Sequence, residues 1–293
     1  MSDPTIIYGL GATKAGTSWL HHYLAGHPDC AMPYPKELHF FDTLDFPHQS
    51  HQLRGLRKRH DQFTRRTQRL ALDNPRRAAL EEKLTAVERY LPVLESLEID
   101  EYRSFMTELG QGKRAAGDIT PAYSLVSERR LREMSQLGPV TKFIYILRDP
   151  VARAWSNIRM LASSKAKASD GDVVRVTNRL IRRMGEGQES ALSERSDYAS
   201  ALQRITAALP ARDVFVEFYE RLFRQDVLDR LCAFLGLPGH RGDTERRVHE
   251  GVSLPLAAPA RAKLRDMLAP QYAAVAARFD DLPQAWRMNM EVA

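Results

Sequence analysis

The chain has 293 residues, of which 43% are hydrophobic and 27% are charged, and its formal net charge is +6. These values are ordinary for a soluble globular protein with one large α/β domain or two small ones. The basic surplus predicts an anionic partner, such as a nucleotide, a sulfated or phosphorylated substrate, nucleic acid or a membrane surface. A merely soluble basic surface accounts for the charge equally well.

Several classes of protein are excluded by features that the sequence lacks. Its two cysteines, Cys30 and Cys232, allow neither a disulfide framework nor a zinc site. The amino terminus has no basic segment followed by a long apolar run, so we expect no signal peptide. No stretch approaches the ~20 apolar residues that a membrane helix needs. We therefore expect a cytoplasmic protein without a membrane partner.

The amino-terminal part begins with a short apolar run at Ile6–Tyr8, which predicts a buried parallel strand. Apolar residues at helical spacing predict a helix over Thr17–Ala25. The segment 30–42 contains two prolines and is expected to be extended. Residues 47–109 are expected to form two or three helices with a break at Asp73–Pro75.

These predicted helices carry a strong positive charge. Between His48 and Arg89 there are eleven Lys or Arg residues against five acids. A basic lid, a surface for an anionic partner and a merely solvated helical face are all compatible with this count.

The rest of the chain alternates strands with helices. We predict a strand-turn-helix unit over 114–125, strands at Phe143–Leu147 and Val214–Phe218, and helices that begin at Asp149, end at Gly236 and span 260–279. The polar segment 163–190 is expected to be a mobile loop with a helix inside. This alternation predicts an α/β fold, a P-loop-like three-layer sandwich with a central parallel sheet flanked by helices. We expect one domain over 1–293, with a helical insertion at about 44–110.

The loop between the first strand and the first helix, "GATKAGTSWL", has the composition of a phosphate cradle. Its small residues let backbone N–H groups approach an anion, and Thr17 and Ser18 add donors at a helix start. Lys14 supplies a positive charge. Neither the Walker pattern nor the Rossmann pattern matches, because Gly16 is followed by Thr17 and the glycines are spaced differently. A plain helix N-cap stays open as the alternative.

A second strand-loop-helix unit, "ILRDPVARAWSNI", places Arg148 at the carboxyl end of a strand and Ser156 two turns into the next helix. In open α/β sheets, ligands bind outside the carboxyl ends of the strands, so Arg148 is expected to face the same crevice as Lys14. Two anion sites on one crevice predict a ligand with a phosphate at each end, and the planar fork of arginine suits a terminal phosphate.

The pairing of "TKAGTSWL" with "LRDPVARAWSNI" resembles the sulfotransferases that use 3′-phosphoadenosine 5′-phosphosulfate (PAPS). The stretches "HPDCAMPYPKELHFFD", "GDITPAY", "FYERL" and "FLGL" appear in the order of that family. The resemblance covers Ile6 to about Leu237 and extends more faintly to Trp286. "KELHFFD" and "TPAY" resemble the branch that contains heparan-sulfate sulfotransferases and many bacterial enzymes.

The resemblance implies a role for each matching residue. Lys14 would contact the bridging oxygen of the phosphosulfate, and Glu37 would be the base that deprotonates the acceptor. PAPS would be the sulfonate donor and 3′,5′-adenosine bisphosphate (PAP) the product, with no metal. The implied donor-binding residues are Lys14, Ala15, Gly16, Thr17, Ser18 for the 5′-phosphosulfate, Arg148 and Ser156 for the 3′-phosphate, and Trp19 and Tyr219 near the adenine.

Each residue near the expected acceptor site also has a simpler interpretation. Glu37 could pair with Lys36 or cap a turn, and Lys36 could contact the sulfonate or only solvent. His39 is an alternative base, or a packed and hydrogen-bonded side chain. Asp118 could orient a substrate or the Glu37 segment, or cap the turn at Thr120.

Three positions depart from the family pattern. Ile119 stands where the branch often has a lysine, and Ser18 stands where many heparan-type enzymes have an arginine. A basic segment that completes the 3′-phosphate site near the carboxyl end has no clear match, although Arg246, Arg247 and Arg261 are candidates.

Other hypotheses stay open. A P-loop kinase or nucleotidase would need magnesium and ATP, and a basic module over 48–89 would bind nucleic acid or another polyanion. The scarcity of aromatic residues in 48–89 argues against nucleic acid. An inactive nucleotide-binding fold is the third alternative. For a sulfotransferase we expect a small-molecule, glycan or carrier-tethered acceptor, walled by 44–110 and 163–190, and a homodimer stays open.

Overall fold

A parallel sheet of five strands organises the computed structural model, which describes residues 3–169, 171–243 and 254–291. The strand order is β2-β3-β1-β4-β5, and every neighbouring pair is parallel. The strands are β1 (Thr5–Gly11), β2 (Cys30–Ala31), β3 (Ala115–Ile119), β4 (Thr141–Leu147) and β5 (Val214–Phe218). The predicted α/β fold class is therefore confirmed.

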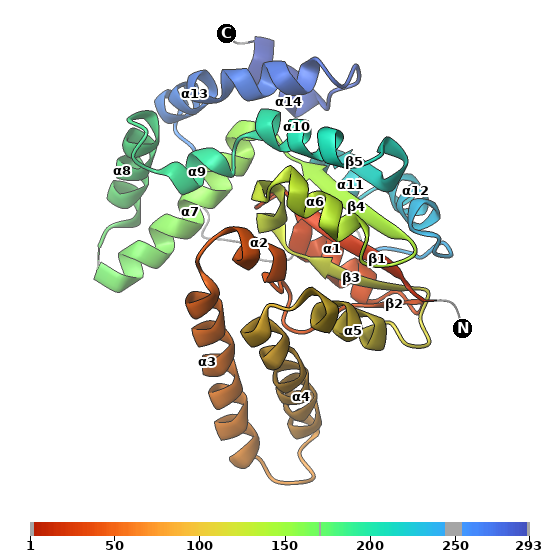
Figure 1. Cartoon of the computed structure of the whole chain (residues 1–293). Coiled ribbons are helices and arrows are strands. Elements are labelled where there is room, and N and C mark those ends of the chain that lie inside the picture. The colour runs from red at the N-terminus through yellow and green to blue at the C-terminus, as the bar shows by residue number, and fades with distance from the viewer. Residues whose placement is uncertain (1–2, 170, 244–253, 292–293) are drawn as a thin grey trace.

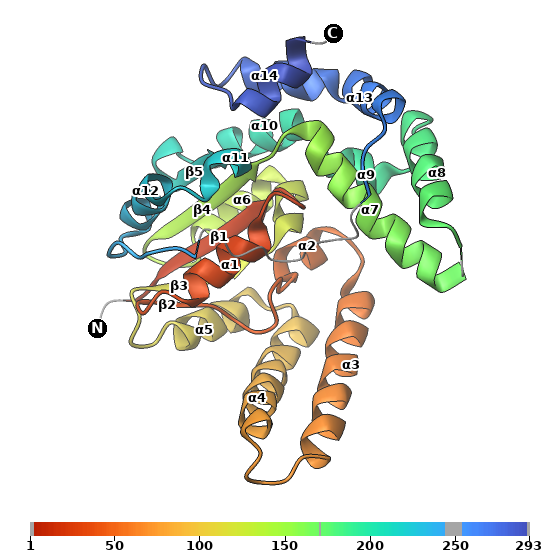
Figure 2. The same cartoon turned by 180° about the vertical axis from the view of Figure 1, so that it is seen from behind.

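Helices cover both faces of this sheet. Figures 1 and 2 show α1 on one face and α6 with α10 on the other, which makes three layers. The helices are α1 (Thr17–Ala25), α2 (Phe40–Asp45), α3 (Gln49–Gln68), α4 (Pro75–Ser96), α5 (Ile99–Leu109), α6 (Glu128–Ser135), α7 (Pro150–Ser169), α8 (Val173–Gly185), α9 (Ser190–Glu194), α10 (Tyr198–Ala208), α11 (Tyr219–Leu222), α12 (Gln225–Leu235), α13 (Ala258–Ala276) and α14 (Gln284–Glu291), with 3-10 turns η1 (Pro121–Leu125) and η2 (Ala211–Asp213).

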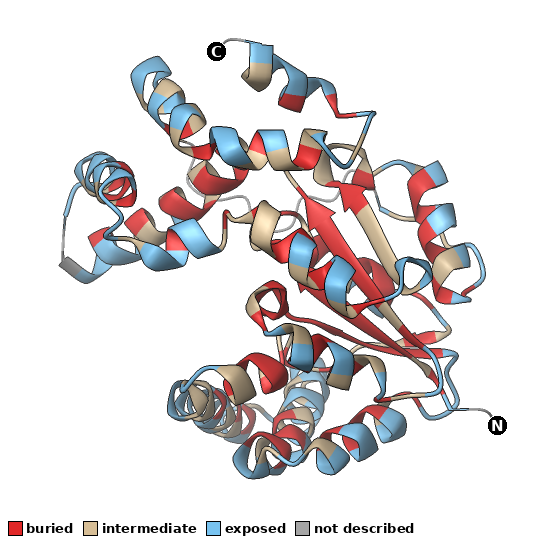
Figure 3. Ribbon diagram, turned by 45° about the horizontal axis from the view of Figure 1, so that its top comes forward, coloured by how far each residue is buried: buried red, intermediate tan, exposed pale blue. Residues whose placement is uncertain are grey.

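The central strands are buried on both sides, as Figure 3 shows, because apolar and aromatic side chains point to both faces. Tyr8 of β1 stacks on Phe143 of β4 with a ring-centroid distance of 5.6 Å, and its edge packs against Phe41. All strands run in one direction, so the carboxyl ends of β1, β3, β4 and β5 meet at one edge of the sheet. This edge carries the candidate site.

Three helices fill the segment between β2 and β3 after the short helix α2. The helices α3 and α4 form an antiparallel hairpin that projects from the body of the protein (Figures 1 and 2). The predicted break at Asp73–Pro75 is confirmed: the side chain of Asn74 caps α4 by accepting from the amide of Arg76 at 2.9 Å. The third helix, α5, packs against β3.

Two predictions of secondary structure were wrong. The segment 163–190 consists of the last turns of α7, a short connection and all of α8, instead of a loop around one helix. Its Lys and Arg residues are good helix formers, and Thr177, Leu180, Ile181 and Met184 give α8 a buried face. The end of the segment 30–42 is also helical, since α2 begins at Phe40.

Candidate active site

The loop after β1 has the backbone that a phosphate cradle requires. Lys14 and Gly16 both adopt the left-handed conformation, with φ of 71° and 84°. A Cβ on Gly16 would lie 3.0 Å from the ring of Tyr219, so only glycine lets the loop approach this ring closely. The amides at the start of α1 have no preceding helical turn to bond. The loop therefore presents the N–H groups of the first turn of α1 and one lysine at the sheet edge.

Arg148 ties this loop to the end of β4. Its Nη1 donates to the carbonyl oxygen of Lys14 at 2.8 Å, and its guanidinium lies 4.4 Å from the ring centroid of Tyr219. The hydroxyl of Tyr198 accepts from the Arg148 amide at 3.2 Å and donates to the Arg148 carbonyl at 2.7 Å. The structure thus brings together Lys14, Gly16, Arg148 and Tyr219, as the motifs predict.

The other predicted donor-binding residues flank this group. Ala15 and Thr17 are buried, whereas Ser18 and Ser156 are half-buried in the first turns of α1 and α7. Trp19 is packed inside the protein, since its ring stacks on Tyr23 and its Nε1 donates to the carbonyl of Asp243. Only 5% of Trp19 is exposed, so its indole is enclosed by neighbouring side chains.

Positive charge accumulates at this edge of the sheet. Burial and the nearby charges of Arg148 and Arg159 lower the pKa of Lys14. In the described ranges of the chain, no carboxylate forms an ion pair with Lys14 or Arg148. Arg159 was not predicted, although its position three residues after Ser156 places both on one face of α7 and was a usable signal. Such a cluster favours an anionic ligand.

Glu37 lies in a second cluster with three neighbours of alternating charge. Its carboxylate forms an ion pair with Lys36 and lies 3.6 Å from Nε2 of His39, whose Nδ1 is 2.8 Å from Asp42 Oδ2. Burial alone would raise the pKa of Glu37, but His39 and Lys36 lower it to about 2. The two carboxylates raise the pKa of His39 to about 9 against the effect of burial. His39 is then protonated at neutral pH, which disfavours it as a base.

A small pocket opens at Glu37. It has a volume of about 90 Å³, and its lining joins the loop before α2 to the helical hairpin. The lining residues are Pro35, Lys36, Glu37, Leu38, His39, Gln52, Gly55, Leu56, Arg59 and Leu94. The charge of Glu37 raises the pKa of Lys14, against the larger lowering by burial, so the two groups lie within Coulombic range of each other.

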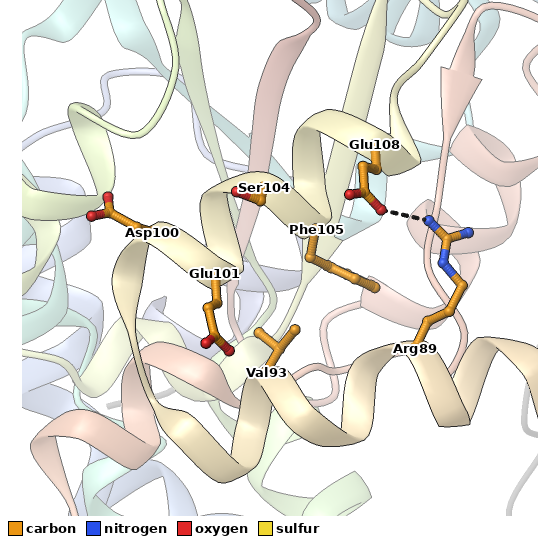
Figure 4. A pocket seen from close by; sticks show the side chains of 7 residues that line it. All are labelled: Arg89, Val93, Asp100, Glu101, Ser104, Phe105 and Glu108. Carbon is orange, nitrogen blue, oxygen red and sulfur yellow. Dashed lines mark hydrogen bonds and ion pairs between the residues drawn. The ribbon is translucent and has the colours of Figure 1, made fainter.

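A larger groove of about 400 Å³ lies between α4 and α5 (Figure 4). The ion pair between Arg89 and Glu108 crosses it, at 3.2 Å. Its lining contains none of the residues predicted for the donor, the base or the acceptor. We therefore place the chemistry at the smaller pocket.

Asp118 lies in a buried hydrogen-bond network. Its side chain is fully buried, and its oxygens accept from the hydroxyls of Tyr102, Thr120 and Tyr123 and, at 3.4 Å, from the amide of Leu38. Its contact with Thr120 is made through the Thr120 hydroxyl. Because Leu38 lies between Glu37 and His39, Asp118 also orients the Glu37 segment.

The basic segment expected to complete the 3′-phosphate site is only partly described. Arg246 and Arg247 lie outside the described residues, and Arg261 is exposed near the start of α13. Two further findings concern the described part of the chain alone. It contains no group of three His, Cys, Asp or Glu residues arranged to hold a metal ion. None of its helices combines the length and the apolar composition that a membrane span requires.

A parallel α/β fold with a glycine-containing cationic loop after β1, and a matching arginine after β4, defines a protein built to bind an anionic ligand. The chain belongs to the sulfotransferase family, whose model matches residues 4–241. A sequence comparison with curated proteins finds no match.

Solved structures show the same fold. A sulfotransferase from Alicyclobacillus acidocaldarius is 22% identical with a TM-score of 0.62, and the match covers 98% of this chain and 100% of that one. The sulfotransferase domain of the Synechococcus PCC 7002 olefin synthase is 18% identical with a TM-score of 0.51, over 97% and 98% of the two chains.

Proposed function

We propose that the protein transfers the sulfonate group of PAPS to a hydroxyl or amine of an acceptor. The observation that carries the proposal is the cluster of positive charge formed by Lys14, Arg148 and Arg159, which lies within Coulombic range of the Glu37 carboxylate. A donor with an anion at each end fits two cationic positions on one crevice. The charges around Glu37 keep its carboxylate ionised, as a group that is to accept a proton must be.

The donor would be held by residues from three strand ends. The loop residues Gly16, Thr17 and Ser18 would bind the 5′-phosphate, and Arg148 with Ser156 would bind the 3′-phosphate. Tyr219 would contact the adenine, since its ring already packs against Arg148 and Gly16. When bound, PAPS supplies an activated sulfonate and a phosphate leaving group.

Lys14 and Glu37 would carry the chemistry. The acceptor oxygen or nitrogen forms a bond to sulfur while the bond between sulfur and the bridging oxygen breaks, and the acceptor proton passes to Glu37. Lys14 stabilises the negative charge that develops on the leaving phosphate. Lys36 and His39 keep Glu37 ionised before the acceptor arrives.

The acceptor would enter the pocket of about 90 Å³ at Glu37. Gln52, Gly55 and Arg59 of α3 line this pocket, so the helical insertion would form the acceptor wall, as expected from its position in the sequence. A narrow pocket of this size admits the reacting group of a small molecule, of a glycan or of a carrier-tethered metabolite, with the rest of the acceptor outside.

Calorimetry with PAP tests the donor site. We expect Lys14→Ala and Arg148→Ala each to weaken binding by about 10- to 100-fold, because each removes a charge-assisted hydrogen bond of about 1.5–3 kcal/mol. Arg212→Ala is the matched control, since its side chain is 84% exposed at the opposite end of β4. Absence of PAP binding in the wild type, or binding of ATP with magnesium instead, contradicts the proposal.

Glu37→Gln separates chemistry from binding in the same assay. It should bind PAP as the wild type does and lose sulfonate transfer by about 10²- to 10⁴-fold, which is the usual contribution of a general base. Full transfer activity in this variant would remove Glu37 as the base.

A further inference from the structure

Arg195 reaches the loop after β1 from a distant part of the chain. It follows α9, and its Nη1 donates to Oγ1 of Thr13 at 2.9 Å across 182 residues of sequence. Thr13 directly precedes Lys14. The Arg195 side chain is half-buried, so solvent reaches part of it. Two arginines therefore donate hydrogen bonds to consecutive loop residues: Arg195 to the Thr13 hydroxyl and Arg148 to the Lys14 carbonyl.

The backbone on the carboxyl side of Arg195 is held in place. The guanidinium of Arg153, which is fully buried in α7, donates to Oγ of Ser196, and this hydroxyl donates to the carbonyl of Leu192 at 2.7 Å. Tyr198 is bonded to both backbone groups of Arg148. Ser196 and Tyr198, which follow Arg195, thus tie its backbone to α7 and to the end of β4.

The surroundings of Arg195 lack a counter-charge. Across the described residues, no carboxylate forms an ion pair with Arg148, Arg153 or Arg195, and Nε and Nη1 of the buried Arg153 have no hydrogen-bond partner. Burial and the charges of Arg195 and Arg148 lower the pKa of Arg153. A buried cation without a counter-charge is unfavourable, so this group of arginines favours an anion near Arg195 and the loop that it contacts.

We propose that Arg195 is a further catalytic residue, which donates hydrogen bonds to the sulfonate oxygens of the donor. The inference rests on the proposed function. In the transfer, sulfur gains a bond to the acceptor and loses its bond to the bridging oxygen, and the acceptor proton goes to Glu37. Arg195 forms and breaks no covalent bond; its charge stabilises the sulfonate oxygens while the group moves.

The test compares PAP, which lacks the sulfonate, with PAPS in the absence of acceptor. Calorimetry of Arg195→Gln should show PAPS binding weakened by about 10-fold and PAP binding unchanged within about twofold. With acceptor present, kcat should fall by about 10²-fold, the usual effect of one lost oxyanion donor. Arg195→Lys keeps the charge and should regain part of the PAPS affinity.

Thr13→Val tests whether Arg195 acts on the sulfonate directly or only by holding the loop through Thr13. It removes the hydroxyl that Arg195 contacts but leaves the guanidinium in place, so PAPS affinity and kcat should stay within about threefold of the wild type. The proposal is overturned if Thr13→Val reproduces the loss seen in Arg195→Gln. It is also overturned if Arg195→Gln weakens PAP and PAPS equally, or weakens neither. Failure of the wild type to bind PAP would instead remove the proposed function itself.

Discussion

His39 shows how single residues set the charge of the site. It lies between Glu37 and the buried Asp42, so two carboxylates share one imidazolium. The sequence motif identified Glu37 and His39 but not Asp42, although Asp42 stands three residues after His39 and α2 places them on one side. The imidazolium orients Glu37 and keeps its carboxylate ionised.

The raised pKa of His39 predicts a dependence of stability on pH. The pKa rises from 6.5 in the unfolded chain to about 9 in the folded protein. Its stabilising contribution is therefore complete below pH 6.5 and is lost as the pH rises through 9. Urea unfolding of the wild type should lose up to about 3 kcal/mol across this window. His39→Gln should lack this loss, and the exposed His51→Gln should retain it. Equal pH slopes in all three proteins would contradict the assignment.

Sequence motifs located the candidate site residues whose neighbours in the sequence form a recognisable pattern. Lys14, Arg148 and Glu37 each stand in a recognisable local pattern, and the structure brings them to one edge. Arg153 and Arg195 have no local pattern, because their partners Ser196 and Thr13 are 43 and 182 residues away. Contacts of this kind depend on the packing of α7 and α9, which no short motif encodes.

Among the helices and strands, apolar runs and terminating glycines predicted the bounds of the elements correctly. The helix Thr17–Ala25 and the strand Val214–Phe218 have the predicted bounds, and Gly236 ends α12 with a φ of 71°. The helix α10 was missed, although Asp197 caps it and its buried face has helical spacing. The helix α14 carries one buried residue, Trp286, so its position depends on tertiary contacts.

The carboxyl-terminal helices fix the start of α7, which follows Arg148. Asp149 caps α7 through the amide of Ala152 at 2.8 Å, and its other oxygen accepts from the hydroxyl of Tyr272 in α13 at 2.6 Å and from Asn289 in α14 at 2.9 Å. These bonds connect the far end of the chain to the donor site.

Tyr272→Phe tests this connection, since it removes one hydroxyl and keeps the packing. We expect the free energy of unfolding to fall by about 1.5–3 kcal/mol, the range for a buried hydrogen bond to a charged group. Urea unfolding should show a lower midpoint with an unchanged slope. Tyr34→Phe is the control, because its hydroxyl has no hydrogen bond within the described residues. A loss of the same size in both variants would show that the bond to Asp149 is not the cause.

Considered as a whole, the molecule assembles its site from segments spread along most of its length. Lys14, Arg148 and Tyr219 follow the carboxyl ends of β1, β4 and β5, which meet at one edge because the strands are parallel. Arg195 reaches the loop after β1 from the end of α9. The fold therefore gathers positive charges that repel one another. This repulsion opposes folding and is relieved when an anion binds.

Lys14→Met should reveal this trade between stability and binding. Without ligand, we expect the variant to be more stable than the wild type by about 0.5–1 kcal/mol, because Arg148 and Arg159 repel the ammonium. PAP at 100 times its Kd should stabilise the wild type by about 2.7 kcal/mol. The same concentration should stabilise Lys14→Met far less, so that the order of thermal midpoints inverts. Thermal scans with and without PAP measure both effects, with Arg212→Ala following the wild type. An unliganded Lys14→Met variant that unfolds below the wild type would show that Lys14 holds the loop together and does not strain it.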